Sequence, residues 1–239
     1  MGRAGPARTV KRFWKDVTVE VQPQGWAISL DGRSVKTPAR AALSVPTEAL
    51  AEAIAEEWRA IAGSIDPRAM PLTGLANAAI DRVATDPQAF AEGLAQYSKA
   101  DLVCYRAEGP AALVRRQEQE WDKLLAWARR RFDVDFVTTS GLIHVVQPAA
   151  TVERLTHAVA ALDPFRLAAL SPLVTIGGSL VAALAVLEKA ITAEEAWAAV
   201  SVDERWQIER WGADAEAVAA LDHRRVDFLA AARFLALLD

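Results

Sequence analysis

The 239-residue sequence contains a single cysteine and only three histidines, and each scarcity excludes a class of site. Cys104 has no second cysteine with which to form a disulfide inside the chain, which favours a reducing compartment. No other His or Cys stands at metal-ligand spacing from His144, His157 or His223, so a zinc or iron site is not expected. We interpret His144, which alternates with apolar residues, as a partly buried structural residue rather than a catalytic base.

The motifs that hold phosphates or present a catalytic nucleophile are also missing. The sequence has no G-x-x-x-x-G-K-[ST], G-x-G-x-x-G or G-x-S-x-G pattern. Gly177-Gly178-Ser179 lacks the lysine and the preceding strand of a phosphate loop, and close helix packing accounts better for its glycines. The sequence therefore predicts a binding protein rather than an enzyme, with no cofactor and no small-molecule substrate.

Positive charge is not in excess, since the formal net charge is −4, and the chain has no global basic field for nucleic acid. Arg129-Arg130-Arg131 is interpreted as the end of a helix, where cations complement the helix dipole. Residues 1–46 carry a net charge of +5 and residues 188–239 a net charge of −5. This asymmetry fits either docking to a polarised partner or acids that solvate exposed helix faces.

One uncharged run, Leu167–Leu187, has about the ~20 residues that a membrane-spanning helix needs. It contains Pro172, several Ser, Thr and Gly residues and much Ala, which inserts weakly into a bilayer. We therefore expect a buried central helix without membrane insertion. Arg3, Arg8, Lys11 and Arg12 give a basic start, but the strand pattern that follows leaves no room for a cleavable presequence, which favours a bacterial cytoplasm.

The pattern of apolar residues predicts a β-rich beginning. Residues 17–21 and 26–30 alternate with period two, and Asp31-Gly32 is typical of a hairpin turn. A helical period starts at Leu50, with Thr47 as the expected N-cap and Gly63 as the expected stop. The result is an antiparallel sheet covered by one helix.

The rest of the chain is expected to be mainly helical. Helices are predicted around 72–84, 87–104, 111–132, 151–162, 173–190, 192–211 and 214–238, with Thr192 and Glu195 forming a capping box. A short hairpin is predicted within Val134–Gln147. The fold class is therefore α+β, with a small antiparallel β-rich N-terminal domain (residues 1–80) followed by a larger mainly α-helical domain (81–239).

Residues 203–217 form the most informative segment. Trp197, Val200, Glu204, Ile208 and Trp211 are expected on one helical stripe, while Glu209 lies on another face. The same spacing allows Glu209 to pair with Arg205, four residues earlier. Gly212 is expected to end this helix, and Asp214 to cap the next one, with Glu216 in its first turn.

Family-like pieces occur in order along nearly the whole chain. They are Arg12-Phe13-Trp14-Lys15, Leu30-Asp31-Gly32-Arg33, Lys36-Thr37-Pro38, Glu57-Trp58, Met70-Pro71-Leu72-Thr73, Ala79-Ile80-Asp81, Asp101, Tyr105-Arg106, Gln117, Trp121, Trp127, Gly178-Ser179-Leu180 and Gln207 through Gly212. In these pieces the sequence resembles the assembly chaperones for the alpha subunit of the F-type ATP synthase catalytic sector. Trp14 is a mild departure, because the family more often has Tyr there.

The resemblance implies a partner and a site. Members of the family bind unassembled alpha subunit, keep it from aggregating and yield it to the beta subunit, and eukaryotic relatives work in the mitochondrial matrix. The family's sensitive acids map onto Glu209 and Asp214, and with Trp211 and Glu216 they make the predicted partner-binding set. Carboxylates beside an exposed aromatic residue suit the polar rim of a hydrophobic contact.

Two alternatives remain open from the sequence. One is an enzyme with a carboxylate site around Asp81, Asp101 or Glu204, which a raised pKa in a pocket would favour. Asn77, one turn before Asp81, belongs to such a site or makes a helix-surface hydrogen bond. The other alternative is a membrane-associated assembly factor that uses Leu167–Leu187.

Overall fold

The computed structural model describes residues 11–239. Arg3 and Arg8, on which the interpretation of the basic start partly rests, lie outside the described residues. The N-terminal sheet contains β1 (Val17–Gln22), β2 (Gly25–Leu30), β3 (Arg33–Ser34) and β4 (Ser44–Val45). The strand β2 pairs antiparallel with the other three, so the sheet is built around it. Asp31 and Gly32 have φ angles of 48° and 74°, which confirms the predicted turn between β2 and β3.

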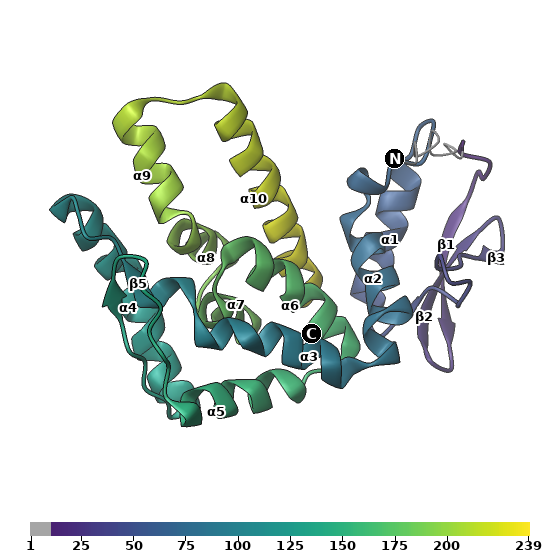
Figure 1. The fold of residues 1–239 in the computed structure, drawn as a ribbon. Coiled ribbons are helices and arrows are strands. Elements are labelled where there is room, and N and C mark those ends of the chain that lie inside the picture. The colour runs from purple at the N-terminus through teal and green to yellow at the C-terminus, as the bar shows by residue number, and fades with distance from the viewer. Residues whose placement is uncertain (1–10) are drawn as a thin grey trace, which may run out of the picture.

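Helix α1 (Glu48–Ala60) packs against this sheet (Figure 1). Thr47 is its N-cap, as predicted, and accepts the N–H of Leu50 at 3.3 Å. The helix ends at Ala60, before the expected stop at Gly63, and Ile61 already has an extended backbone. The Arg12 guanidinium donates to the carbonyl oxygens of Arg59 (3.2 Å) and Ile61 (2.6 Å), as a C-terminal cation does at many helices.

The remaining nine α-helices of the described residues form the larger part of the molecule. They are α2 (Pro71–Asp81), α3 (Pro87–Ala95), α4 (Ala111–Phe132), α5 (Ala149–Ala160), α6 (Pro164–Gly177), α7 (Leu180–Leu187), α8 (Ala193–Val200), α9 (Val202–Trp211) and α10 (Ala215–Ala236). The predicted α+β class, with the β-rich part first, is confirmed. The boundary at residue 80 stays a prediction, since α2 packs against α1 on one side and against α6 and α10 on the other.

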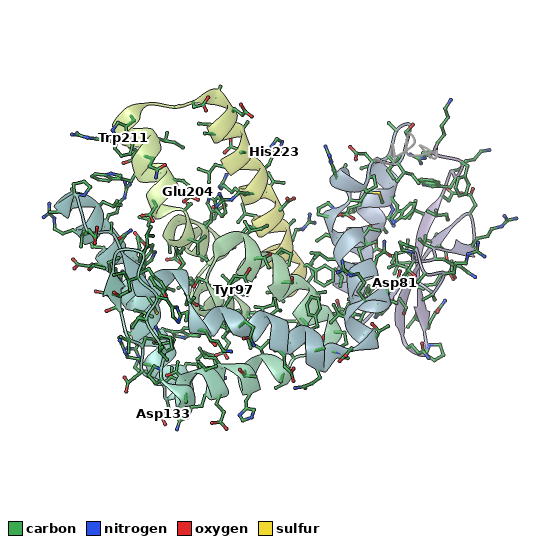
Figure 2. All side chains as sticks on the ribbon, in the orientation of Figure 1. Asp81, Tyr97, Asp133, Glu204, Trp211 and His223 are labelled. Carbon is green, nitrogen blue, oxygen red and sulfur yellow. The ribbon has the colours of Figure 1, made fainter. Side chains whose placement is uncertain are left out.

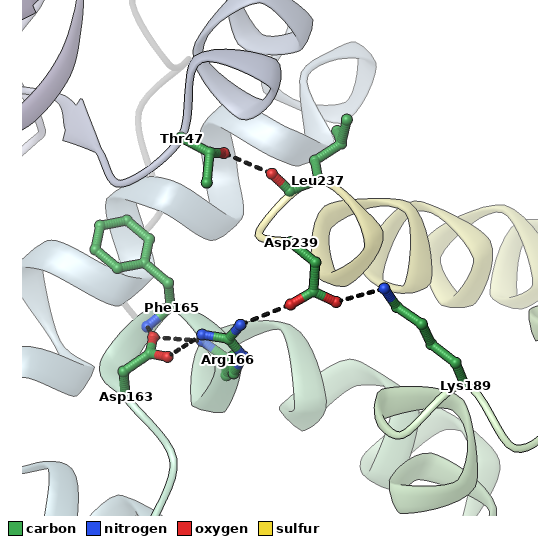
Figure 3. A network of polar contacts seen from close by, with 7 residues as sticks. All are labelled: Thr47, Asp163, Phe165, Arg166, Lys189, Leu237 and Asp239. Atoms are coloured by element: carbon green, nitrogen blue, oxygen red, sulfur yellow. Dashed lines mark hydrogen bonds and ion pairs between the residues drawn. The ribbon is translucent and has the colours of Figure 1, made fainter.

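The chain end that follows α10 lies between the N-terminal part, which holds the sheet and α1, and the helical part (Figure 3). Asp239 accepts hydrogen bonds from Arg166 of α6 (2.7 Å) and from Lys189 (2.9 Å). Thr47, the N-cap of α1, donates its hydroxyl to the carbonyl of Leu237. The bond from Thr47 joins the N-terminal part to the end of the chain, whereas the two bonds of Asp239 lie within the helical part.

Three predicted helices are interrupted. The helix expected at 87–104 is α3 followed by 3-10 turns that break at Asp101. The helix expected at 173–190 is two helices, because Gly178 has a φ of 67° and Ser179 caps α7. α6 also begins earlier, at Pro164, and it includes Pro172. The helix expected at 192–211 breaks at Ser201, whose buried hydroxyl donates to the carbonyl of Trp197 (2.6 Å).

The predicted hairpin within Val134–Gln147 is wrong. Instead β6 (Thr139–Ser140) pairs in parallel with the distant β5 (Tyr105–Arg106). The side-chain amide of Gln147 closes the loop by bonding both the N–H (3.0 Å) and the carbonyl (2.8 Å) of Val137. The Gln147 side chain therefore satisfies the Val137 backbone groups that a paired strand would have satisfied. His144 is exposed rather than partly buried, and its Nδ1 lies 3.2 Å from the Tyr105 hydroxyl.

The uncharged run Leu167–Leu187 is shared between α6 and α7, and most of its side chains are buried in the core. A methyl group added at Gly177 would lie 3.3 Å from Phe228 and Val200, so this glycine permits close helix packing as expected. Within residues 11–239, none of the helices combines the length and apolar character that crossing a bilayer requires.

Candidate functional site

The segment singled out in the sequence is a helical hairpin made of α9 and α10, which projects from the helical domain (Figure 1). Gly212 ends α9 with a φ of 89°, and its N–H donates to the carbonyl of Ile208 at 3.0 Å. Asp214 then caps α10 by accepting the N–H of Glu216 at 3.3 Å. Both predicted boundaries are confirmed, and both place polar groups at the outer end of the hairpin.

The expected stripe of apolar residues is divided by the break at Ser201. Trp197 and Val200 stay on α8, where they are buried, and the Trp197 ring lies 5.5 Å from that of Phe228. Trp211 is instead 74% exposed. It lies at the outer end of α9, where Figure 2 labels it. The break thus directs one part of the stripe into the core and leaves Trp211 free for contact with another molecule.

Glu209 does not pair with Arg205 but with a residue of α4. Its two carboxylate oxygens accept hydrogen bonds from the Arg116 guanidinium at 2.6 and 2.9 Å, a bidentate pair. These bonds hold the pKa of Glu209 below its usual value. Arg205 contributes only a weaker electrostatic effect. Glu209 is exposed as predicted, but in the free chain it already has a cationic partner.

A buried polar network fixes α4 against the base of α9. Gln117 is 1% exposed and joins two segments, accepting the N–H of Ala107 (2.8 Å) and donating to Asp203 (2.7 Å). One turn later, the Trp121 indole donates to the carbonyl of Ala199 at 2.7 Å. Burial raises the pKa of Asp203, while its bond to Gln117 lowers it.

Sequence reasoning missed these supports for different reasons. Arg116 and Glu209 are 93 residues apart, and nothing local in either helix predicts their contact. Gln117 had a signal, since it falls one turn before Trp121 on the apolar stripe of its helix and was therefore a polar residue at a core position.

Between α9 and α10 lies a groove of about 440 Å³. Its walls include Ile208 and Trp211 from one helix and Ala217, Ala220 and Leu221 from the other. At its inner end Arg224 bridges to Glu204 at 2.9 Å. The groove therefore has mainly apolar walls, a polar inner end, and an outer end near Trp211 that the connection of residues 212–214 spans.

The carboxylates proposed for an enzyme are engaged in separate structural roles. Asp81 accepts the Thr37 hydroxyl (2.6 Å) and the N–H of Ala39 (2.9 Å), and it lies far from Glu204 (Figure 2). The Asn77 side-chain oxygen is buried without a hydrogen-bond partner among residues 11–239, so the expected helix-surface bond is not made.

Asp101 is the one of these acids with a strongly shifted pKa. Burial raises it to about 6, but the group is fully enclosed and accepts the N–H groups of Val103 and Val181. Catalysis by paired carboxylates requires two such groups facing one cleft. Asp101, Asp81 and Glu204 do not meet in one, and the described residues contain no group of three or more His, Cys, Asp or Glu suited to a metal ion.

Comparisons with known proteins agree with this architecture. A family model described as "ATP12 chaperone protein" matches residues 11–129. The crystal structure of Atp12 from Paracoccus denitrificans is 45% identical, with a TM-score of 0.91 over 96% of this chain and 98% of that one. A mutant of the same protein gives the same TM-score at 44% identity. "Protein atp12, mitochondrial" of Schizosaccharomyces pombe is 26% identical over 219 residues, which are 87% of this chain and 75% of that protein.

Proposed function

The chain belongs to the ATP12 chaperone family, and on this premise we propose that it binds the unassembled alpha subunit of the F-type ATP synthase. In this role it prevents the aggregation of the free subunit and promotes assembly of the catalytic sector. The bound subunit is called the client below. The proposed site of action is the bacterial cytoplasm, with the mitochondrial matrix as the equivalent place for eukaryotic relatives.

One observation supports the hairpin as the binding surface: Trp211 is a large aromatic residue that is 74% exposed at the outer end of α9. Tryptophan is among the residues that most often dominate the energy of protein interfaces. Glu209, Asp214 and Glu216 lie around it at the same end of the hairpin and supply a charged rim. We propose these four residues as the partner-binding set.

Release of the client needs no nucleotide in this proposal. A chaperone that covers an assembly surface is displaced when a better partner, here the beta subunit, competes for the same client. Binding of moderate affinity is then sufficient, because the client has only to bind the chaperone more strongly than it binds other copies of itself.

The function is tested with isolated alpha subunit. The purified protein should suppress its aggregation, measured by light scattering, at a near-stoichiometric ratio. Equal suppression of an unrelated unfolded protein would indicate a nonspecific holding activity, and no suppression at all would remove the proposal.

The site is tested by exchanging the charges of Arg116 and Glu209. Glu209→Lys should abolish protection of the client, but it also breaks the bond to Arg116 and sets two cations together. The double variant Arg116→Glu with Glu209→Lys restores an internal ion pair of reversed polarity. If Glu209 contacts the client, the double variant should melt like the wild type and still fail to protect.

A matched control comes from α1, where Glu52 is also exposed and also paired with an arginine, Arg59, at 3.0 Å. Glu52→Lys should leave protection intact. Recovery of protection in the double variant would show that Glu209 acts only by holding α9, and the assignment of Glu209 as a binding residue would be wrong.

A further inference from the structure

The groove between α9 and α10 has two walls with the same spacing. Each wall is a stripe of four residues at positions i, i+3, i+4 and i+7 of its helix. They are Glu204, Gln207, Ile208 and Trp211 on α9, and Ala217, Ala220, Leu221 and Arg224 on α10. These are the stripes with which helices pack against other helices.

The two stripes face each other without packing together. α9 packs against α4 and α8, while α10 packs against α6, α2 and α8, and the hairpin stays open between them (Figure 1). Packed helices ordinarily lie 8–10 Å apart. A groove of about 440 Å³ therefore remains where direct contact would be expected, and Trp211 stays exposed at its outer end.

The chemistry of the walls selects the conformation of an occupant. Both walls are helices whose backbone groups are hydrogen-bonded internally, so they offer no free edge to an added β-strand. Recognition must use side chains, and Ala217 and Ala220 leave room for a close-lying backbone opposite the larger Ile208 and Trp211. These features suit a third helix that inserts its apolar face.

The charge of the hairpin indicates which side chains the inserted helix should carry. Residues 202–224 contain six acidic residues and three arginines, a net charge of −3. Arg224 is already paired with Glu204 at the polar inner end. Asp214 and Glu216, at the outer end of the hairpin, make no ion pair with any residue of 11–239. Charge complementarity therefore favours an occupant with Lys or Arg beside its apolar stripe.

We propose that this groove receives one amphipathic helix of the client, with apolar residues at i, i+3 or i+4, and i+7 and with basic residues on its flank. This inference rests on the proposed function and adds the structural class of the segment that is bound. A second copy of the chain is the competing occupant.

The first test fills the groove. Ala220 lines the groove, whereas Ala219 is also exposed but is not among the lining residues. Ala220→Trp should lower affinity for isolated alpha subunit at least tenfold, and Ala219→Trp should change it less than twofold. Both variants replace an exposed alanine of the same helix, so their melting temperatures should fall equally and slightly.

The second test identifies what lies in the groove. A photo-crosslinking amino acid is placed at position 220, or at 219 as the control, and the complex with alpha subunit is digested and mapped by mass spectrometry. Crosslinks from 220 should converge on one client segment with the helical period and with Lys or Arg beside it.

The outcomes separate the two proposals. If the complex forms but Ala220→Trp binds normally, or if position 220 reaches an acidic or non-amphipathic segment, the groove inference is wrong while the chaperone proposal survives. If Ala220→Trp abolishes a self-associated form detected by sedimentation, the occupant is a second copy and the inference is likewise wrong. If no complex forms with the wild type, the proposed function fails and the inference falls with it.

Discussion

The raised pKa of Asp101 has a structural origin, and its effect on the free energy of unfolding can be tested quantitatively. The group is fully buried where the loop after α3 meets the start of α7. Its two carboxylate oxygens accept the N–H of Val103 at 3.2 Å and of Val181 at 2.9 Å. Burial raises its pKa from 3.8 to about 6, although the hydrogen bonds from Ser179 and from the backbone lower it. The test substitution is Asp101→Asn, which keeps the shape of the side chain and removes its ionisable carboxyl group.

The sign of the effect follows from the direction of the pKa shift. Because the folded state holds the proton more tightly than the unfolded state, the neutral carboxyl favours folding below the unfolded pKa, near 4. This contribution is lost as the pH rises through the folded pKa of about 6. A shift of roughly two pKa units corresponds to a change on the order of 3 kcal/mol in the free energy of unfolding.

The assay is urea unfolding of the wild type and of Asp101→Asn at pH 4, 5, 6 and 7. The free energy of unfolding of the wild type relative to the variant should decrease by on the order of 3 kcal/mol across this range. Acids with lowered pKa values, such as Glu209 and Asp239, act in the opposite direction, but they are present in both proteins and cancel in the difference. A difference that is flat, or that grows with pH, would refute the argument that desolvation outweighs the hydrogen bonds at this site.

Two further substitutions test the supports of the hairpin. Trp121→Phe removes the bond from the indole to the Ala199 carbonyl and leaves that carbonyl buried, so the free energy of unfolding should fall by about 1–3 kcal/mol in urea titrations. Asp214→Asn keeps an N-cap of equal quality without the charge, so it should weaken client binding with an unchanged melting temperature, whereas Asp214→Ala should also cost about 1 kcal/mol of stability. Equal melting temperatures for the two Asp214 variants would show that the cap is not a stabilising contact.

Local signals in the sequence predicted local structure well. The Thr192 capping box and the Asp214 cap depend on side chains within three residues of the backbone groups that they satisfy, and the Asp31-Gly32 turn depends on the positive φ of its own two residues. The periodic stripe of α4 likewise predicted its bounds, 111–132, because its buried residues follow the helical repeat without interruption.

The errors occurred where distant groups decide the local conformation. The break at Ser201 divides a sequence of continuous helical period, and both halves contact α4, but only α8 also packs against α7 and α10. The hairpin within Val134–Gln147 failed because β6 pairs with β5, more than thirty residues earlier, and Gln147 satisfies Val137 instead. The bonds of Ser201 to Trp197 and of Gln147 to Val137 lie within the two segments, but the helices and the strand that pack against these segments lie elsewhere in the chain.

The same reasoning explains why the candidate site was only half visible in the sequence. Trp211, Glu209, Asp214 and Glu216 are close along the chain, so a single segment identifies them. The groove and the bond to Arg116 depend on how α9 is placed against α10 and α4, which is set by contacts across the fold.

The way α9 is held has a consequence for binding. Val202 is its only fully buried residue, and three polar contacts also hold it to the body, Arg116 to Glu209, Gln117 to Asp203 and Arg224 to Glu204. A helix with so little apolar burial gains little of its stability from the core, and exposed ion pairs are weakened by salt. Its apolar stripe toward the groove is covered only when another molecule lies there. If the groove receives a client helix as proposed, binding should therefore stabilise α9, and the polar contacts keep α9 positioned before binding.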